Sequence, residues 1–382
     1  MQFTLDPDVI FLNHGSFGAC PAELLARYQQ WQNRLESEPV RFLQRELPDL
    51  MRAARERLAE FVGAAEDEVV FIPNPTFGAN TIARSLDLRR DDEILISDHE
   101  YGACVNAWKF VAEKQGARVV ERRITLPVSS DEAIVEEFCA GFSSRTRLIL
   151  LSQITSPTAL TLPIAEICRR AAARGILTLI DGAHVPGQID LRLDELGADF
   201  YISTCHKWMC APKGTGFLYA RRDRQALIEP LVVGWGWGPS RQFRCGSDFV
   251  DHHYWLGTFD PAAYLTVPEV IDWQARHDWP VVRERCHGMA RTAVEEAATW
   301  FGSVPVHSPD FYRQMGLIEL PDLARRGLEP RELQRRLFDE FRIEIPIIAW
   351  RDRCFARVSL QVYNTANDVA ALIEAWRRIF PG

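Results

Sequence analysis

Two charged side chains stand just after short apolar runs of the sequence, at positions that could bring them into one pocket. Asp181 follows the run 176–180, and Lys207 follows the run 200–203 across a short polar cluster. Both runs are short and rich in β-branched or aromatic residues, which favours buried parallel strands over helices. Ligands of open α/β sheets bind at the carboxyl ends of the strands. We therefore expect Asp181 and Lys207 to share a pocket.

The elements that would position these groups alternate along the first part of the chain. Apolar runs typical of strands alternate with helical spacing of apolar residues, which predicts an α/β domain with a largely parallel sheet. The segment 1–20 is predicted to be non-helical, and 249–259 is aromatic and contains glycine. We expect further strands at 69–72, 93–97, 117–121, 148–152 and 217–220, with helices at about 21–36, 47–62, 76–86, 130–140 and 163–174.

Other predicted strand ends also carry reactive or aromatic groups. Thr76 lies in a small-residue turn before a predicted helix, where free backbone N–H groups and the helix dipole favour an anion. The simpler interpretation of Thr76 is a helix N-cap. The remaining groups of this kind are His99 with Tyr101, Thr155 with Ser156, and His184.

Together these side chains match the requirements of pyridoxal 5'-phosphate (PLP). Its aldehyde forms a Schiff base with a lysine, its ring nitrogen needs a carboxylate, its phosphate needs N–H donors, and its ring accepts an aromatic stack. Each residue alone has a simpler explanation: a lysine after a strand is often on the surface, and an aspartate before glycine often forms a turn. Their joint occurrence favours the cofactor.

Composition and charge exclude several classes of function. The net charge is −8 and there is no basic stripe, so we expect no nucleic-acid partner. The nine cysteines are irregularly spaced and include no Cys-x-x-Cys pair, and we recognise no secretory leader in the sequence. Both observations indicate reduced thiols and a cytoplasmic location. No apolar run is long enough to span a membrane. We expect no metal site, because the spacing of Cys205, His206, Cys210, His252 and His253 fits no common zinc pattern, and His252 and His253 would point apart on a strand.

The same patterns predict the domain organisation. Residues 1–20 are expected to form an N-terminal arm that contributes to the active site. Its Gly-rich stretch at 13–18 would let the backbone approach a ligand closely, and the simpler interpretation is an entry turn before the next helix. Residues 21–260 are expected to form the large PLP-binding domain. Residues 261–382 are expected to form a smaller α+β domain, with helices at 261–277, 281–300, 330–341 and 368–380.

Several motifs carry a resemblance to a known family. They are Asn-His-Gly-Ser-Phe-Gly at 13–18, Asn-Pro-Thr at 74–76, His-Glu-Tyr-Gly at 99–102, Thr-Ser-Pro-Thr at 155–158, Asp-Gly-Ala-His at 181–184, His-Lys-Trp at 206–208, Gly-Thr at 257–258 and Arg-Val-Ser at 357–359. In this order they resemble the class V aminotransferases, and most closely the isopenicillin N epimerase-like branch. The resemblance implies a fold-type I PLP-dependent transferase, with a mostly parallel seven-stranded sheet in the large domain and a smaller C-terminal α+β domain.

The resemblance also implies roles for individual residues around the cofactor. Lys207 matches the lysine that binds the aldehyde and moves the Cα proton, and Asp181 matches the partner of the ring nitrogen. Tyr101 matches the ring-stacking position, with His99 as the alternative. The phosphate cup is matched by Thr76, Phe77, Gly78, Thr204 and His206, and the surroundings of the ring oxygen by His184 with Thr155 or Ser156, although Gln153 stands where the branch often has histidine.

The substrate and the partner subunit are implied in the same way. Arg357 matches the arginine that clamps the substrate carboxylate, and Asn13 and His14 lie in the arm that would contact substrate. Thr258 matches a residue that reaches the phosphate of a neighbouring subunit, which implies a homodimer with shared active sites. Trp235, Trp237 and Tyr254 are expected to line either a large or aromatic substrate pocket or the dimer interface.

The resemblance leaves more than one reaction open. A family enzyme acts on an amino acid through an external aldimine and Cα deprotonation, and then completes either an epimerisation or a C–S lyase β-elimination, as in the hercynylcysteine sulfoxide lyases. An aminotransferase is the alternative, and a non-catalytic binding protein on the same fold is the alternative of another class. A cysteine desulfurase is disfavoured, because the stretch 344–353 holds no cysteine and Cys354 adjoins the Arg357 strand.

Overall fold

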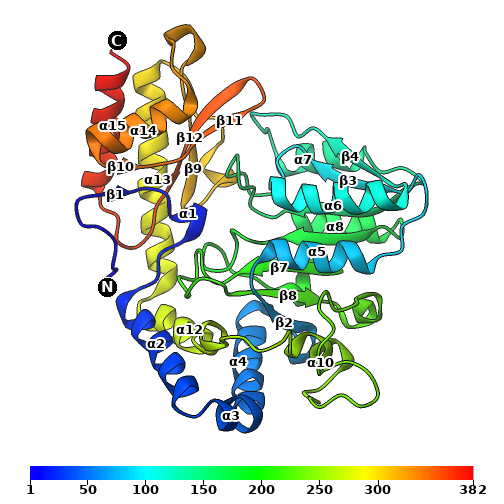
Figure 1. The fold of residues 1–382 in the computed structure, drawn as a ribbon. Helices are drawn as coiled ribbons and strands as arrows, with labels where there is room; N and C mark the ends of the chain where they lie inside the picture. Colours follow the sequence, from blue (N-terminus) through cyan, green and yellow to red (C-terminus); the bar gives the residue numbers. More distant parts are fainter. Residues whose placement is uncertain (382) are drawn as a thin grey trace.

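A seven-stranded sheet forms the centre of the larger part of the protein (Figure 1). The structure is a computed structural model that describes residues 1–381. The strands are β2 (Val69–Ile72), β3 (Glu93–Ser97), β4 (Arg118–Arg122), β5 (Thr146–Ser152), β6 (Leu177–Asp181), β7 (Phe200–Thr204) and β8 (Gly216–Ala220). Their order is β2-β8-β7-β6-β5-β3-β4; β8 is antiparallel to both of its neighbours, and all other neighbouring pairs are parallel.

The central strands are buried on both faces, which explains why their sequences read as continuous apolar runs rather than as alternating ones. Every residue of β2, β3, β7 and β8 is buried. Ser152 at the end of β5 pairs with Asp181 at the end of β6, so polar groups collect where the parallel strands end. The helices between the strands are α5 (Pro75–Ser85), α6 (Gly102–Gln115), α7 (Asp131–Cys139), α8 (Ile164–Ala172) and α9 (Leu193–Leu196).

The N-terminal segment crosses to the C-terminal part of the chain. Strand β1 (Ile10–Phe11) pairs in parallel with β10 (Ile343–Glu344), and Asn13 forms an isolated bridge with Ser359. The expectation that 1–20 holds no helix is wrong at one turn, α1 (His14–Phe17). The next elements along the chain are α2 (Ala22–Ser37), α3 (Pro39–Arg41), η1 (Phe42–Glu46), α4 (Leu47–Val62) and η2 (Glu66–Glu68).

The C-terminal part holds a three-stranded antiparallel sheet beside the long helix α13 (Trp279–Phe301) (Figure 1). The order of its strands is β11 (Ile347–Trp350), β12 (Arg353–Ser359) and β9 (Met315–Glu319). The helix predicted at 261–277 is two helices, α11 (Ala262–Leu265) and α12 (Val267–Arg276), which contact α2 and α4. The other elements are η3 (Arg222–Leu227), η4 (Pro309–Phe311), η5 (Ala324–Arg326), α14 (Pro330–Phe341) and α15 (Ala366–Ile379).

One further local expectation is corrected by the structure. His252 and His253 do not lie on a strand but in helix α10 (Asp248–Tyr254), which begins after Ser247, whose Oγ accepts from the Val250 N–H. A serine cap with two acidic residues near the helix start is a helix signal that the aromatic composition of this segment conceals. Across residues 1–381 no helix combines the length and the apolarity needed to cross a membrane.

Candidate active site

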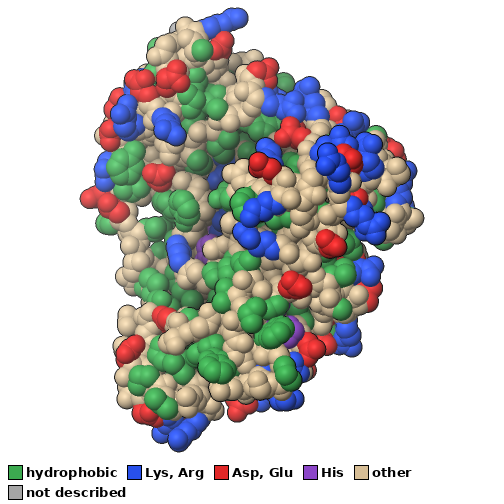
Figure 2. Space-filling model, turned by 45° about the vertical axis from the view of Figure 1, so that its right-hand side comes forward, with side chains coloured by type: hydrophobic (Ala, Val, Ile, Leu, Met, Phe, Trp, Pro, Cys, Tyr) green, Lys and Arg blue, Asp and Glu red, His purple; other side chains and the backbone are tan. Residues whose placement is uncertain are grey.

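A cavity of about 490 Å³ lies where the central parallel strands end. Figure 2 shows a hollow on this side of the molecule, with a histidine and basic side chains inside it. The chain brings together there eight residues singled out from the sequence: Thr76, Tyr101, Ser156, Asp181, His184, Thr204, His206 and Lys207.

Asp181 is the acidic group of this cavity. Its Oδ1 accepts the backbone N–H of Ala183 at 2.8 Å, and the thiol of Cys104 lies 3.5 Å from its Oδ2. Burial raises the pKa of Asp181, while the Ala183 N–H and the charge of Lys207 lower it. A second acid lies nearby: both carboxyl oxygens of Glu100 accept serine hydroxyls, Ser97 at 2.5 Å and Ser152 at 2.7 Å, and burial raises the pKa of Glu100 to about 8.

Lys207 is a basic group that lines the same cavity. Burial, and then the positive charge of Arg357, lower the pKa of Lys207 to about 8. Its Nζ lies 3.3 Å from Nε2 of His184, and the other ring nitrogen of His184 accepts the indole N–H of Trp208 at 3.1 Å. A lysine amine whose pKa is close to 8 is largely available as a nucleophile at slightly alkaline pH.

The N-terminal arm packs directly on the turn that carries Lys207. His14 is fully buried, and its Nε2 donates to the backbone carbonyl of Lys207 at 2.9 Å. A Cβ added to Gly18, whose φ is +69°, would meet the carbonyl oxygen of His206 at 2.0 Å, so only glycine allows this approach. His14, predicted to contact substrate, contacts the backbone of Lys207 in this structure.

Arg357 lies at the edge of the cavity on strand β12. Its guanidinium donates to the backbone carbonyl of Ser156, to Ser156 Oγ at 3.2 Å and to Ser16 Oγ at 3.2 Å, and both serines line the cavity. Asn13 Oδ1 accepts from the Ser16 hydroxyl at 2.5 Å. The Nε of Arg357 is buried without a partner among the described residues, and burial lowers the pKa of Arg357 to about 10. The arginine therefore has donor capacity left for an anion.

The start of helix α5 forms another wall of the cavity. Thr76 is not the N-cap; Asn74 is, because its Oδ1 accepts the N–H of Phe77 at 2.9 Å. Gly78 packs against the sheet, where an added Cβ would lie 2.5 Å from the Ile202 side chain. Thr76 itself lines the cavity, in the first turn of the helix.

Lys213 is a second lysine of the cavity, and no sequence motif singles it out. It lines the cavity together with Lys207, and its Nζ donates to the carbonyl of Gly18 at 2.9 Å. Burial lowers the pKa of Lys213 below its ordinary value. The cavity therefore holds two amines, of which only Lys207 adjoins His184.

Several predicted site residues lie away from this cavity. His99 is buried, with Nδ1 at 2.6 Å from Thr158 Oγ1 and Nε2 donating to the carbonyl of Ile124 at 2.9 Å. The Thr155 hydroxyl is buried and accepts the N–H of Leu160. Thr258 and Trp235 line a different cavity of about 420 Å³, and Trp237 is exposed.

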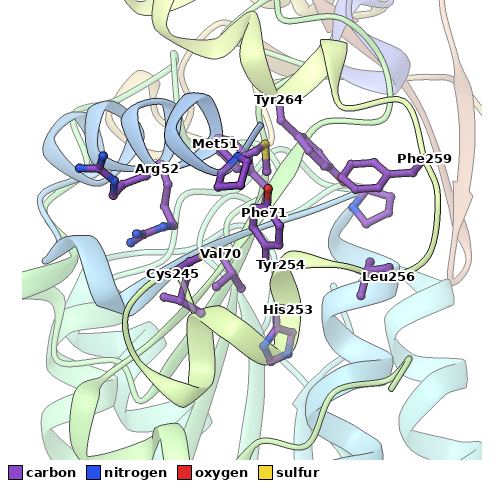
Figure 3. Close-up of a pocket in the computed structure, with 14 residues that line it drawn as sticks. Met51, Arg52, Val70, Phe71, Cys245, His253, Tyr254, Leu256, Phe259 and Tyr264 are labelled. Carbon is purple, nitrogen blue, oxygen red and sulfur yellow. The ribbon is translucent and has the colours of Figure 1, made fainter. Parts of the chain in front are cut away.

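A further apolar cavity of about 250 Å³ lies between α4, β2 and α10 (Figure 3). Figure 3 shows Met51, Phe71 and Tyr254 grouped on one side of it and His253 on another. Of the residues predicted for the site, Tyr254 lines this cavity, and Pro73 is the residue that it shares with the cavity of Lys207. We therefore take the cavity of about 490 Å³, which is lined by Asp181 and Lys207, as the candidate active site.

Comparison with known proteins agrees with this geometry. The family model described as aminotransferase class-V matches residues 16–301. The isopenicillin N epimerase of Amycolatopsis lactamdurans is 37% identical, over 99% of this chain and 97% of its own length. The chain belongs to the aminotransferase class-V family. A probable chloroplastic L-cysteine desulfhydrase of Arabidopsis thaliana is 29% identical over 97% of this chain and 82% of its own length. A solved C-DES structure with glycine covalently linked to its PLP cofactor has the same fold, with a TM-score of 0.81, 20% identity and coverage of 97% of this chain and 96% of that one.

The protein is a PLP-dependent class V enzyme, and its fold is fold-type I. The donor set of the cavity fits PLP: an amine of lowered pKa, a buried carboxylate, a helix start with Thr76, and the exposed ring of Tyr101. His206 adds a ring nitrogen, because its Nδ1 donates to the carbonyl of Thr215 at 3.0 Å and leaves Nε2 available. Among residues 1–381 no cluster of three or more His, Cys, Asp and Glu side chains is arranged to hold a metal ion.

Proposed function

We propose that this class V enzyme is an amino-acid epimerase or racemase, or a C–S lyase that works by β-elimination. The observation that supports it best is the arrangement of Lys207, Asp181 and Arg357 around one cavity. Bound PLP supplies an electron sink that weakens the bonds at the substrate Cα. Lys207 would hold the cofactor and take the Cα proton on Nζ, Asp181 would keep a proton on the ring nitrogen, and Arg357 would bind the substrate carboxylate.

The relatives divide between the two reactions. The relative with 37% identity is named an epimerase, and the one with 29% identity is named a desulfhydrase. Both reactions begin with the removal of the Cα proton and differ in the next step, which is either reprotonation of Cα or loss of the β-substituent. The higher identity over nearly the whole chain favours epimerisation. An aminotransferase is the alternative, and a non-catalytic protein of this fold is the alternative outside enzymes.

One set of assays separates these reactions. The purified enzyme is incubated with a panel of L-amino acids and cysteine conjugates in deuterated water. Deuterium at Cα together with inversion supports the epimerase, and pyruvate with released thiol or sulfide supports the lyase. Amino transfer to an added keto acid without inversion or pyruvate would instead make the protein an aminotransferase. No reaction with any substrate and no visible absorption after addition of PLP would contradict the proposal.

A homodimer with shared sites is part of the proposal. Thr258 is separated from the Lys207 cavity of its own chain, as expected for a residue that serves a second copy. Trp235 lines the same cavity as Thr258 and exposes 58% of its surface. Such a large exposed aromatic side chain favours a subunit interface that would cover it. Sedimentation should give a dimer. Mixing Lys207→Ala with Thr258→Trp chains should restore activity in one of the two sites of a hybrid, and the absence of any restored activity would contradict shared sites.

A cytoplasmic location also belongs to the proposal. It rests on the irregular set of nine cysteines, seven of which are buried in the structure. Fractionation of cells that produce the protein tests it, and recovery outside the cytoplasm would contradict it.

A further inference from the structure

A histidine in the active site holds its proton on one defined ring nitrogen. The indole N–H of Trp208 is an obligatory donor, and it lies 3.1 Å from Nδ1 of His184. Nδ1 must therefore present its lone pair, and a neutral His184 must carry its proton on Nε2. Both side chains are buried, with Trp208 0% and His184 1% exposed, so water does not compete for these groups.

The nitrogen that carries this proton faces Lys207. Nε2 of His184 lies 3.3 Å from Nζ of Lys207. An N–H at that position can donate to the lone pair of a neutral amine, whereas an ammonium group has no lone pair and would point its own N–H groups at another donor. We propose that Trp208 fixes the tautomer of His184, and that His184 thereby holds Lys207 as the neutral amine that attacks an aldehyde.

The charges around Lys207 agree with this assignment. Arg357 adds a positive charge that disfavours the ammonium form, while the carboxylate of Asp181 favours it. His184 cannot compensate by becoming an imidazolium, because its Nδ1–H would then oppose the indole N–H. Burial together with the charge of Lys207 holds the pKa of His184 well below its ordinary value. Trp208 is thus a positioning residue that acts on Lys207 through His184.

The role of Trp208 rests on the proposed function, but its test does not need the cofactor. The full chain is freed of aldehyde with hydroxylamine, dialysed, and labelled with trace acetic anhydride between pH 6 and 11. Acetylation of Lys207 is read by mass spectrometry against the exposed Lys109 as internal standard. The test therefore reports on Lys207 even if the protein fails to bind PLP.

The decisive variant is Trp208→Phe, which removes the indole N–H and keeps an aromatic ring. His184 can then move its proton to Nδ1 and accept from an ammonium. The pKa of Lys207 should rise by one unit or more, which lowers its acetylation at neutral pH about tenfold. Trp279→Phe is the matched control, because Trp279 is also buried and donates its N–H to the carbonyl of Gly187 at 2.9 Å. That control should leave the pKa of Lys207 unchanged.

Two further results decide whether the effect passes through His184. In a His184→Phe background, Trp208→Phe should cause no additional shift of the Lys207 pKa. A shift of equal size in that background, or no shift in Trp208→Phe alone, would overturn the proposal. Should Trp208→Phe not fold, long-range ¹H–¹⁵N spectra of the wild-type chain test the same point: a proton on Nε2 of His184 supports it, and a proton on Nδ1 overturns it.

Discussion

His14 Nε2 lies 2.9 Å from the backbone carbonyl oxygen of Lys207, although the two residues are 193 positions apart in the chain. The Nδ1 of the same ring lies 3.0 Å from the hydroxyl of Tyr363. Because the carbonyl can only accept, Nε2 carries the proton and Nδ1 accepts from Tyr363. The arm and the C-terminal part of the chain therefore hold the turn of the candidate catalytic lysine from one side.

Replacing this histidine should affect both folding and catalysis. His14→Phe removes one of the two donors to the Lys207 carbonyl, which keeps the Cys210 N–H at 3.0 Å, and takes from the Tyr363 hydroxyl its His14 acceptor. The cost should be roughly 1–3 kcal/mol in the free energy of unfolding. The turnover number should also fall, because the lysine turn loses its support. Urea unfolding and steady-state kinetics measure the two effects. Tyr363→Phe removes only the second contact and should cost less; wild-type stability in His14→Phe would contradict this role.

Arg357 should determine the affinity for the substrate carboxylate. Arg357→Lys keeps the charge but loses the paired N–H donors, so KM should rise by about 10–100-fold while the fold is retained. The control is the corresponding amine without a carboxylate, whose binding should be the same in both proteins. Equal KM values for the wild type and Arg357→Lys would show that another group binds the carboxylate.

Asp181 should be required for chemistry rather than for folding. Asp181→Asn keeps an oxygen that can accept the Ala183 N–H, so thermal stability should change little. Turnover should fall by about 100-fold or more, because an amide does not hold a proton on the ring nitrogen. Cys104→Ser keeps a donor to Asp181 and should retain activity within a few-fold. Undiminished turnover in Asp181→Asn would remove Asp181 from the mechanism.

Glu100 should make the stability of the protein depend on pH. Its pKa is raised from the ordinary 4.5 to about 8, so between these values the folded state binds more protons than the unfolded state. The stability that it contributes is therefore complete below pH 4.5 and is lost as the pH rises through 8. Relative to Glu100→Gln, the wild type should lose about 2–3 kcal/mol of unfolding free energy between pH 5 and 8. Urea titrations at both pH values measure this, and parallel curves for the two proteins would contradict it.

Much of the sheet and part of the site can be predicted from the sequence. The runs at 69–72 and 93–97 match β2 and β3, because strands buried on both faces read as uninterrupted apolar segments. Asp181 and Lys207 meet at one cavity because the strands that precede them are parallel neighbours. In such a case the local pattern and the tertiary environment favour the same structure.

The remaining features depend on contacts between distant segments. Nothing near His14 in the sequence indicates that its ring binds the Lys207 backbone, and nothing near Trp208 indicates that its indole binds His184. Lys213 lacks a motif of its own and reaches the cavity through the turn after Lys207. The aromatic composition of helix α10 is typical of a strand. The segment is nevertheless helical, and Ser247 caps its N-terminus.

The identity of the lysine that binds the cofactor tests the proposed active site most directly. Lys207 and Lys213 line the same cavity, so both are within reach of an aldehyde there. The full chain is loaded with PLP, reduced with borohydride and digested, and the modified peptide is identified by mass spectrometry. We predict the label on Lys207, and none in Lys207→Ala under the same conditions. A label on Lys213, or no label on the wild-type chain, would contradict the proposed active site.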